Sequence, residues 1–338
     1  MRALMTVAPG GPEALEWFDL SEPVPGPGEA CIAVRAVGLN ATDLLMMRDL
    51  YQDKVTRPFS PGGEVAGFVE SVGDGVTDLV VGDRVVAITG SGGLREKVVL
   101  PAASWTRIPE QVSFEEAAVL PIAYASALHA LQDRARLVSG ERVLVLGAGA
   151  GIGLAAVQIA AHLGAEVVAA CSTSEKVEAA LAGGAASGFV YSPPGSDASG
   201  RRELRRVFAE AVGEGGADVV VDPVSGPYAE PAARSMSIGG RYILVGFAAG
   251  VGPMPNNVIL VKRGEVIGSA LGEHLKDRPQ HIETLMGQLL DWCAIGTLRP
   301  TITSVIPLDE AAAGLELLDR HAITGKVVVQ IGEQAGDR

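Results

Sequence analysis

The sequence has few cysteines and few aromatic residues. Its 338 residues include three cysteines, Cys31, Cys171 and Cys293, and only 4% Phe, Trp and Tyr. Three widely spaced thiols do not suggest a disulfide framework and are typical of a reducing compartment. We therefore expect a cytoplasmic protein whose stability comes from its core rather than from covalent cross-links.

Basic residues and long apolar runs are also scarce. The chain has 27 Lys and Arg against 40 Asp and Glu, for a net charge of -13. Nucleic-acid affinity depends on clustered basic residues, so this balance argues against a nucleic-acid partner. No run of eighteen apolar residues occurs and no signal-peptide pattern opens the chain. We expect a soluble protein with no membrane partner.

The sequence does show a change of pattern near residue 115. Before it, short β-branched runs punctuated by Gly and Pro predict an irregular β-rich unit. After it, six apolar strands alternate with helical patterns, which predicts a doubly wound parallel sheet. A later helix and a strand-helix-strand ending in KVVVQI are expected to complete the first unit. The predicted fold is therefore α/β, with one domain formed by residues 1–118 and 271–338 and a second formed by residues 119–270.

The stretch VLVLGAGAGIG, residues 143–153, is the densest glycine cluster in this second domain. The literal G-x-G-x-x-G pattern fails, because counting from Gly147 puts Ile152 at the last glycine position. The cluster nevertheless joins a predicted strand to a predicted helix, where backbone N–H groups and the helix dipole favour a pyrophosphate. A packing turn without a ligand is the alternative, and the alternating strands around the cluster favour the dinucleotide.

The end of the second predicted strand bears on which dinucleotide is bound. An NAD site usually has an Asp or Glu there, but this chain reads AACSTSEK, with Cys171 near the expected position. The hydroxyls of Ser172 and Thr173 and the cation of Lys176 suit a 2′-phosphate, which favours NADPH. The alternative is that Ser174 caps the next helix and Lys176 is solvated surface; both interpretations can hold together.

Six segments carry a likeness to a known family: VRAVGLNATD (34–43), PGGEVAGFVESVGDGVTDLVVGDRV (61–85), LPIAYASALHAL (120–131), VLVLGAGAGIGLAAVQIA (143–160), VDPVSG (221–226) and ITGKVVV (323–329). In this order they resemble the zinc-free quinone oxidoreductase branch, which includes zeta-crystallin, of the medium-chain dehydrogenase/reductase superfamily. The resemblance implies a GroES-like β-barrel domain, a Rossmann domain inserted into it, and a homodimer.

The same resemblance bears on metal binding. Alcohol dehydrogenases of the superfamily have a catalytic cysteine where this chain has Asn40, and Gly-His-Glu where it has Gly62, Gly63 and Glu64. The five histidines show no metal-ligand spacing with one another, so we expect no metal. Because alcohol oxidation needs a Lewis acid to stabilise the alkoxide, the expected activity is zinc-independent hydride transfer from NADPH to a quinone or an α,β-unsaturated carbonyl compound. The alternative is an NADPH-binding protein with a structural or regulatory role and little turnover.

The resemblance also implies roles for individual residues. Asn40 would contact the nicotinamide ribose or the substrate. Tyr51 is the first candidate for a donor to the substrate carbonyl, with a lid or surface aromatic as the alternative. The other implied cofactor contacts are Ser126 near the nicotinamide, Ala150, Gly151, Ile152 and Gly153 at the pyrophosphate, Ser172, Thr173, Lys176 and Tyr191 at the 2′-phosphate, His321 where some relatives have a phosphate-binding arginine, and Phe247 and Lys326 on the nicotinamide side and the phosphates. The alternative for Phe247 is a packing role without cofactor contact, and the alternative for Lys326 is an ordinary surface position.

Overall fold

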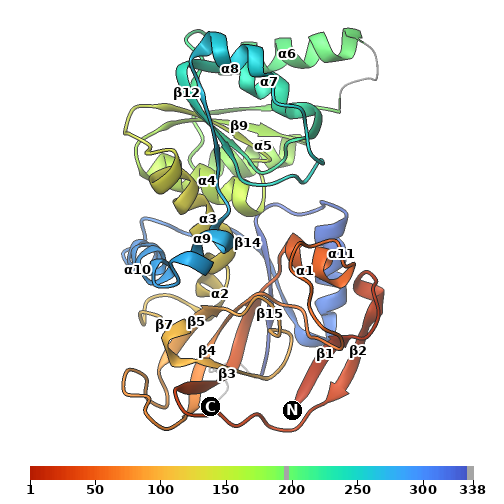
Figure 1. The fold of residues 1–338 in the computed structure, drawn as a ribbon, viewed down its shortest axis with the longest axis vertical. Helices are drawn as coiled ribbons and strands as arrows, with labels where there is room; N and C mark the ends of the chain where they lie inside the picture. The colour runs from red at the N-terminus through yellow and green to blue at the C-terminus, as the bar shows by residue number, and fades with distance from the viewer. Residues whose placement is uncertain (194–197, 333–338) are drawn as a thin grey trace. The chain divides into compact units, whose positions relative to one another are not determined.

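The computed structural model describes residues 1–193 and 198–332, and the chain divides into two compact units (Figure 1). The first unit comprises Met1–Ile122 together with the chain from Met286 onward, and the second comprises Ala123–Leu285. The chain returns from the second unit to the first after residue 285, inside a helix. The sequence pattern predicts this boundary at residue 270. No helix in the described part of the chain is long and apolar enough to cross a membrane.

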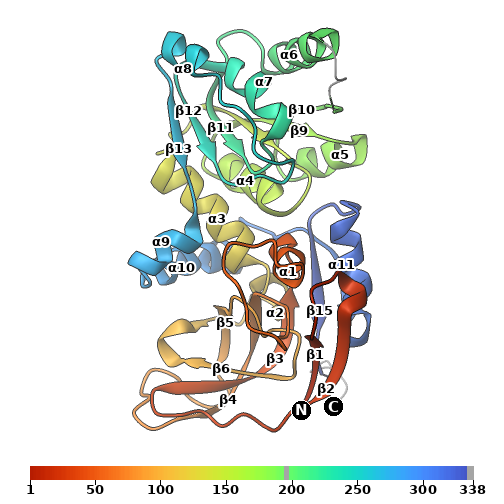
Figure 2. The ribbon, with the colours of Figure 1, turned by 45° about the vertical axis from the view of Figure 1, so that its right-hand side comes forward.

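The first unit is built on a largely antiparallel sheet with the strand order β14-β15-β3-β4-β5-β7, to which β6 is added beside β3 (Figure 2). A separate antiparallel pair is formed by β1 and β2. The strands of this unit are β1 (Arg2–Thr6), β2 (Leu15–Asp19), β3 (Glu29–Gly38), β4 (Glu64–Val72), β5 (Arg84–Ile88), β6 (Lys97–Pro101), β7 (Thr106–Arg107), β14 (Ile302–Pro307) and β15 (Lys326–Gln330). Its helices are α1 (Ala41–Met47), α2 (Phe114–Ala117) and α11 (Ala311–Asp319), together with most of α10 (His281–Ala294).

The end of β3 is the point at which three strands of this sheet meet. Gly38 is paired with Glu64 at the start of β4 and with Val328 of β15. The next residue, Leu39, donates its N–H to the carbonyl of Val327 at 3.0 Å. The register therefore brings the start of α1, the start of β4 and the start of β15 to one place in the unit.

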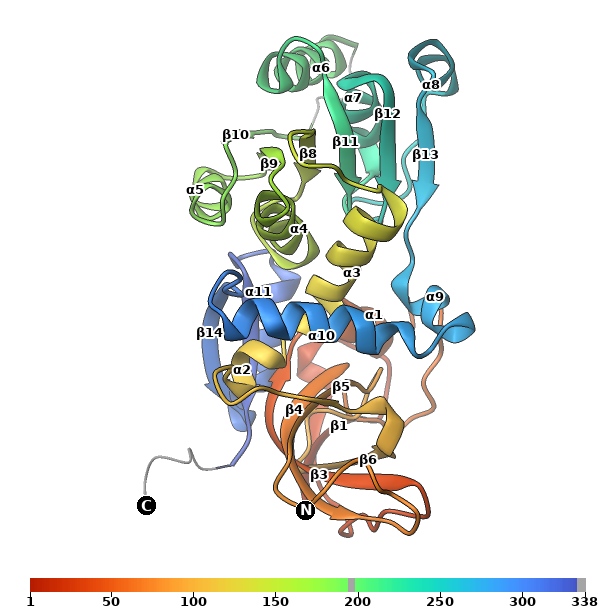
Figure 3. The same ribbon diagram turned by 90° about the vertical axis from the view of Figure 1, so that its left-hand side faces the viewer.

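The second unit confirms the predicted doubly wound sheet. Six parallel strands have the order β10-β9-β8-β11-β12-β13, with helices on both faces (Figure 3). Its strands are β8 (Arg142–Leu146), β9 (Glu166–Cys171), β10 (Ser187–Val190), β11 (Ala217–Asp222), β12 (Met236–Leu244) and β13 (Glu265–Gly268). Its helices are α3 (Ala125–Leu128), α4 (Gly151–His162), α5 (Ser174–Ala182), α6 (Ala198–Val212), α7 (Ala229–Arg234), α8 (Asn256–Lys262) and α9 (Leu271–Asp277).

The strand order explains where this sheet can bind a ligand. Strand β8 lies at the centre, and four of its five residues are fully buried because both faces are covered. The chain runs outward from β8 through β9 to β10 and then returns to β11 on the other side. The carboxyl ends of β8 and β11 therefore flank the switch point of the sheet, where doubly wound folds bind their ligands.

Candidate functional site

The glycine turn after β8 has the backbone that a dinucleotide turn requires. Gly147 and Gly151 have φ values of 61° and 50°, which glycine adopts at little cost. A Cβ on Gly153 would lie 2.1 Å from the carbonyl oxygen of Gly147, so a glycine is needed there for α4 to pack on the end of β8. The sequence departs from the literal pattern because Gly153, one position later, provides this close helix-strand contact.

The start of α4 offers donors and space for an anion. Ala150 caps the helix without a side-chain hydrogen bond, and the first-turn N–H groups of an α-helix have no acceptor within the helix. A Cβ added to Gly151 would meet no atom within 4 Å, so open space lies in front of this turn. The residues predicted to flank a pyrophosphate, Ala150 to Gly153, therefore fit that group.

The loop after β11 lies against this turn. A Cβ on Gly147 would come within 2.8 Å of Cγ2 of Val224. The loop is held by the buried carboxylate of Asp222, whose Oδ1 accepts the N–H groups of Val224 and Ser225 at 2.8 and 2.7 Å. Tyr242 donates its hydroxyl to Oδ2 of the same carboxylate, and burial raises the pKa of Asp222. These contacts hold Ser225 at a φ of 58°. They thereby fix the loop after β11, which lies on the other side of the switch point from the glycine turn.

The tip of β9 has no anionic side chain at its end. Cys171 is buried, and burial raises the pKa of its thiol to about 11. Thr173, not Ser174, is the cap of α5, and its hydroxyl accepts the N–H of Lys176 at 3.3 Å. Lys176 is half-buried, and its aliphatic stem lies against the glycine turn. A Cβ added to Gly149 would lie only 2.4 Å from the Cβ of Lys176. The stem of Lys176 is therefore held beside the turn, and the residue is not a fully exposed surface side chain.

Tyr191 does not lie among the exposed hydroxyls of this tip. It is only 6% exposed, and its ring packs against Tyr228 with the ring centroids 4.6 Å apart. Its hydroxyl is hydrogen-bonded to the backbone of Gly147, and burial raises its pKa. Tyr191 supports the glycine turn from the core of the second unit, which corrects the expectation that it binds the 2′-phosphate.

The first unit contains a buried ion pair at the meeting point of β3, β4 and β15, which we call the Lys326 network. The ammonium of Lys326 donates to the Leu39 carbonyl at 2.9 Å, to Oδ1 of Asn40 at 2.6 Å and to Oε1 of Glu64 at 2.8 Å. The amide of Asn40 donates in turn to Oε1 of Glu64 at 2.8 Å and to the Gly38 carbonyl at 3.2 Å. Lys326 is 3% exposed and Glu64 is fully buried.

This network satisfies all the donors of its ammonium group. The second oxygen of Glu64 accepts the N–H of Ile122 at 2.8 Å, and Gly38 makes room for the carboxylate, since a Cβ there would lie 2.4 Å from Oε1. A buried ion pair is tolerated when its geometry is good and its remaining hydrogen bonds are made. Both the surface and the cofactor-phosphate interpretations of Lys326 are therefore wrong, because its three donors are used inside the core.

Asp43 holds the backbone around this network. Its Oδ2 accepts the N–H of Asn40 at 2.8 Å, and its Oδ1 accepts the N–H of Gly62 at 3.0 Å. Burial raises the pKa of Asp43 to about 6, against the lowering effect of these two hydrogen bonds and of Lys326. The sequence prediction missed both Asp43 and Glu64 as site residues; the signal for Asp43 was its place three residues after Asn40 at a helix start.

The other predicted residues lie in both units. Ser126 of α3 is partly exposed between buried neighbours, as a residue that contacts a ligand would be. Phe247, after β12, is 52% exposed, so the packing interpretation is wrong. In the first unit, Tyr51 is partly buried in the loop after α1, and His321 is exposed with a φ of 52°. The roles expected of these residues stay predictions.

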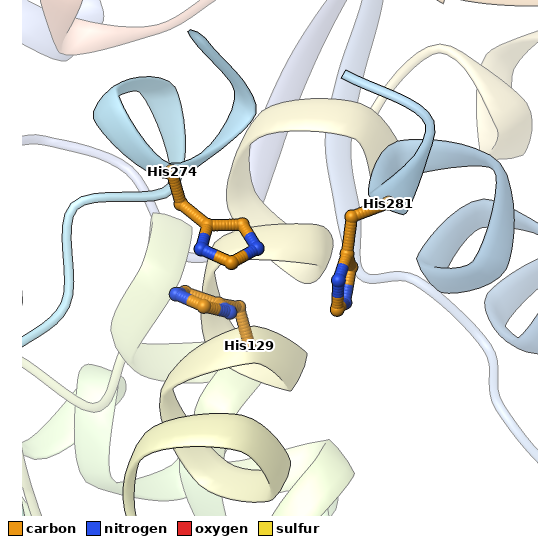
Figure 4. A group of neighbouring side chains, drawn as sticks. All are labelled: His129, His274 and His281. Atoms are coloured by element: carbon orange, nitrogen blue, oxygen red, sulfur yellow. The ribbon is translucent and has the colours of Figure 1, made fainter. Parts of the chain in front are cut away.

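Three of the five histidines come together in the second unit. The side chains of His129, His274 and His281 converge, and their possible ligand atoms all lie within 4.8 Å of one another (Figure 4). The fold thus brings together three histidines that show no metal-ligand spacing in the sequence, and the expectation that the protein binds no metal stays a prediction. Sequence spacing could not reveal the group, because the residues come from three different segments.

Similarity to known proteins extends over most of the chain. The family model described as the alcohol dehydrogenase GroES-like domain matches residues 26–110, and the model described as zinc-binding dehydrogenase matches residues 151–290. Quinone oxidoreductase-like protein 2 of Bos taurus is 34% identical over 90% of this chain and 86% of its own length. The structure of the quinone oxidoreductase of Thermus thermophilus, also solved as a complex with NADPH, is 35% identical, with a TM-score of 0.81 over 98% of this chain and 100% of that one. The CurK enoyl reductase is 27% identical, with a TM-score of 0.82 over 98% and 99% of the two chains.

Proposed function

Because the chain belongs to the quinone oxidoreductase branch of the medium-chain dehydrogenase/reductase superfamily, and is an oxidoreductase, we propose that it transfers a hydride from NADPH to a quinone or an α,β-unsaturated carbonyl compound. The observation that carries the proposal is the Lys326 network. It includes Asn40, at the position where the alcohol dehydrogenases of the superfamily have a zinc-binding cysteine.

The residues at this position do not suit a catalytic zinc. The amide of Asn40 is already bound to the ammonium of Lys326, and a metal cation would meet that positive charge. Gly63 has no ligand atom, and a Cβ there would lie 3.1 Å from Cδ1 of Ile122 and 3.2 Å from the Gly90 carbonyl. Zinc needs three or four converging N, S or O ligands, so this position lacks the Lewis acid that alcohol oxidation uses. A quinone or enone needs none, because its conjugated carbonyl accepts the electron pair.

The second unit supports NADPH as the cofactor. When bound, NADPH supplies a hydride from C4 of its nicotinamide ring. The N–H groups of Gly151, Ile152 and Gly153 would hold the pyrophosphate, and Lys176 with the hydroxyls of Ser172 and Thr173 would hold the 2′-phosphate. Cys171, at the end of β9, is buried with a raised pKa, so its thiol adds no negative charge there; the carboxylate of Glu175, which is hydrogen-bonded to the side chains of Thr173 and Ser174, would have to turn away from that phosphate.

In the first unit, Asn40 is the proposed contact to the nicotinamide ribose or the substrate. Its backbone N–H is held by Asp43 and its amide by Glu64 and Lys326, so its position is fixed before any ligand arrives. A preoriented contact lowers the barrier by holding the reacting groups in register. Tyr51 remains the proposed donor to the substrate carbonyl. Replacing Tyr51 with Phe should then lower kcat while leaving the NADPH dissociation constant unchanged.

We also propose that the protein is a cytoplasmic homodimer. Strand β13 is the edge of the six-stranded sheet, with Val266 exposed at 40%, and Leu260 and Val261 of the neighbouring α8 are each 78% exposed. An edge strand with exposed apolar side chains can pair with a second copy of the chain. The three cysteines are free thiols, which supports a reducing compartment.

The cofactor is tested by titrating NADPH and NADH against the wild type and Lys176→Ala. A charge-assisted hydrogen bond to phosphate contributes about 1.5–3 kcal/mol, so the variant should bind NADPH roughly ten-fold or more weakly and NADH unchanged. Lys276→Ala, an exposed lysine of α9, is the matched control. Equal affinity of the wild type for NADH and NADPH would overturn the choice of cofactor.

The acceptor is tested by NADPH consumption with 1,4-quinones, short enones and an enoyl-CoA, and by NADP⁺ reduction with simple alcohols. We expect at least one conjugated acceptor to be reduced much faster than any alcohol is oxidised. Alcohol oxidation faster than every conjugated acceptor would contradict the proposal. Firm NADPH binding without turnover of any compound would instead favour an NADPH-binding protein with a structural or regulatory role.

A further inference from the structure

The convergent histidines of the second unit come from three segments (Figure 4). His129 opens a π-helical segment, His129–Arg134, which follows α3 directly and also carries Asp133. His274 lies on α9, and His281 is the first residue of α10. The ring of His274 lies 4.6 Å from that of His129 and 4.9 Å from that of His281, measured between centroids. We call these three histidines and Asp133 the histidine cluster.

Asp133 lies where two of the imidazoles meet. Its Oδ2 is 2.7 Å from Nδ1 of His129 and 3.2 Å from Nε2 of His281. A carboxylate oxygen accepts hydrogen bonds, so each nitrogen must present an N–H to this oxygen to make a favourable contact. Nδ1 of His129 and Nε2 of His281, which belong to different helical segments, thus both face Oδ2 of Asp133. A metal cation can take the place of the protons between them.

The third histidine is incompletely satisfied. Nε2 of His274 is buried and has no hydrogen-bond partner among the residues that the structure describes. Buried polar atoms without a partner are rare, and each one calls for a ligand, an ion or a water to complete it. The partner missing from this nitrogen is the second observation, independent of the convergence of the rings, that points to a ligand at this place.

We propose that the histidine cluster is a binding site for a divalent transition metal ion, with Zn²⁺ as the ion that fits best, held by His129, His274, His281 and the carboxylate of Asp133. On binding, each nitrogen that faces Asp133 gives up its proton and its lone pair coordinates the metal: a neutral imidazole takes up a proton at its other nitrogen, and a protonated one releases its extra proton to solvent, so each ligand is a neutral imidazole. The lone pair of His274 Nε2 gains the partner that it lacks.

The donor set and its dimensions suit zinc. Three imidazole nitrogens and a carboxylate oxygen favour Zn²⁺ over Mg²⁺ and Ca²⁺, which prefer sites made of oxygen alone. With bonds of about 2.0–2.1 Å, neighbouring ligands of a tetrahedral zinc lie ~3.3 Å apart. The distance of 3.2 Å from Asp133 to His281 is already close to that value. The possible ligand atoms of the three histidines lie within 4.8 Å of one another, so on binding the most distant of them would have to approach by about 1.5 Å.

This site goes beyond the proposed function and does not depend on it. None of its four residues corresponds to the catalytic zinc ligands of the alcohol dehydrogenases, whose positions are Asn40 and Gly63 here. The ion would tie α9, the start of α10 and the π-helical segment together. Its expected effect is therefore on the stability of this part of the second unit, as for a structural metal.

The test uses the full chain without an affinity tag, stripped of metal by a chelator and dialysed. Zn²⁺ is titrated in competition with a chromophoric chelator. We expect one tight site per chain, at least ten-fold weaker in His274→Ala and lost in His274→Ala/His281→Ala. His162→Ala, which removes an exposed histidine at the end of α4, is the matched control and should bind like the wild type. Zn²⁺ should also raise the Tm of the wild type and not that of the double variant.

A second measurement needs no variant. Co²⁺ added to the stripped wild type should give the intense visible bands of a four-coordinate ion with nitrogen and oxygen ligands, and Zn²⁺ should remove them. Binding no tighter in the wild type than in the double variant would overturn the proposal, as would an equal loss in His162→Ala. A Co²⁺ spectrum that matches the hydrated ion would also overturn it.

Discussion

The two units each contain a polar cluster, buried in the first unit and partly exposed in the second, and the clusters differ in how completely they are satisfied. In the first unit, the ammonium of Lys326 has three acceptors, and both oxygens of Glu64 accept hydrogen bonds. In the second unit, two imidazoles share one carboxylate oxygen and His274 keeps a buried nitrogen without a partner in the described chain. A complete network fixes side chains in place, whereas an incomplete one retains the capacity to bind a ligand.

The largest expected effect comes from breaking the complete network. Lys326→Met leaves the buried Glu64 without its cationic partner, which should lower the free energy of unfolding of the first unit by about 3–5 kcal/mol. Urea denaturation of the full chain measures the loss as a shift of the transition that reports this unit.

Two further variants separate the buried charge from lost packing. Glu64→Gln/Lys326→Met removes both charges and should recover most of the lost stability. Lys97→Met, which removes the partner of the more exposed Glu22 and Glu70, should cost less than about 1 kcal/mol. A Lys326→Met protein as stable as Lys97→Met would show that the buried pair does not stabilise the first unit.

The pH dependence of stability should show the burial of Asp43. Its pKa is about 6 in the folded protein against the ordinary value of 3.8. Because the folded pKa is the higher one, the contribution of Asp43 is full well below pH 3.8, is lost as the pH rises through about 6, and should fall by about 2 kcal/mol between pH 4 and pH 6.5. The measurement compares urea midpoints at pH 4 and pH 6.5.

Asp43→Asn should flatten this decline, although it also weakens the hydrogen bonds to Asn40 and Gly62 and lowers stability at both pH values. Asp309→Asn, at an exposed position, should leave the decline unchanged. An Asp43→Asn protein with the full decline between pH 4 and pH 6.5 would mean that another group causes it.

Most of the second unit could be predicted from the sequence because its signals are local. Apolar strands alternate with helical segments, and the strands from β8 to β13 form in that order. The glycine turn and the serine and threonine hydroxyls after Cys171 are likewise short segments whose chemistry is set by neighbouring residues. The turn is also where strict pattern matching failed, since Gly153 makes the close contact one position after the expected glycine.

The polar clusters could not be predicted because their partners are distant in the sequence. Lys326 and Glu64 are separated by 262 residues, and a lysine at the start of a strand is usually exposed. His129 and Asp133 have helical spacing, but His274 and His281 lie on different helices and reach His129 only through the tertiary fold. The sequence predicts that Tyr191 binds the 2′-phosphate, but its side chain is buried and supports the glycine turn instead.

The smallest expected effect comes from the incomplete cluster without metal. In the stripped protein, His274→Leu removes a buried nitrogen that has no partner, so stability should change by less than about 1 kcal/mol and in the stabilising direction. With Zn²⁺ added, the wild type should become the more stable of the two. The measurement is the urea midpoint of both proteins with and without Zn²⁺. A loss of about 2 kcal/mol or more without metal would show that the nitrogen has a stabilising partner.

The central claim is that hydride transfer needs NADPH and a conjugated acceptor but no metal, whatever the histidine cluster binds. It is tested most directly with NADPH deuterated at C4 and an enone as the acceptor, by measuring deuterium on carbon in the product of the chelator-stripped protein and of the same protein reloaded with Zn²⁺. The account predicts that the label reaches carbon at equal rates in both. Transfer that is absent from the stripped protein and restored by Zn²⁺ would contradict it.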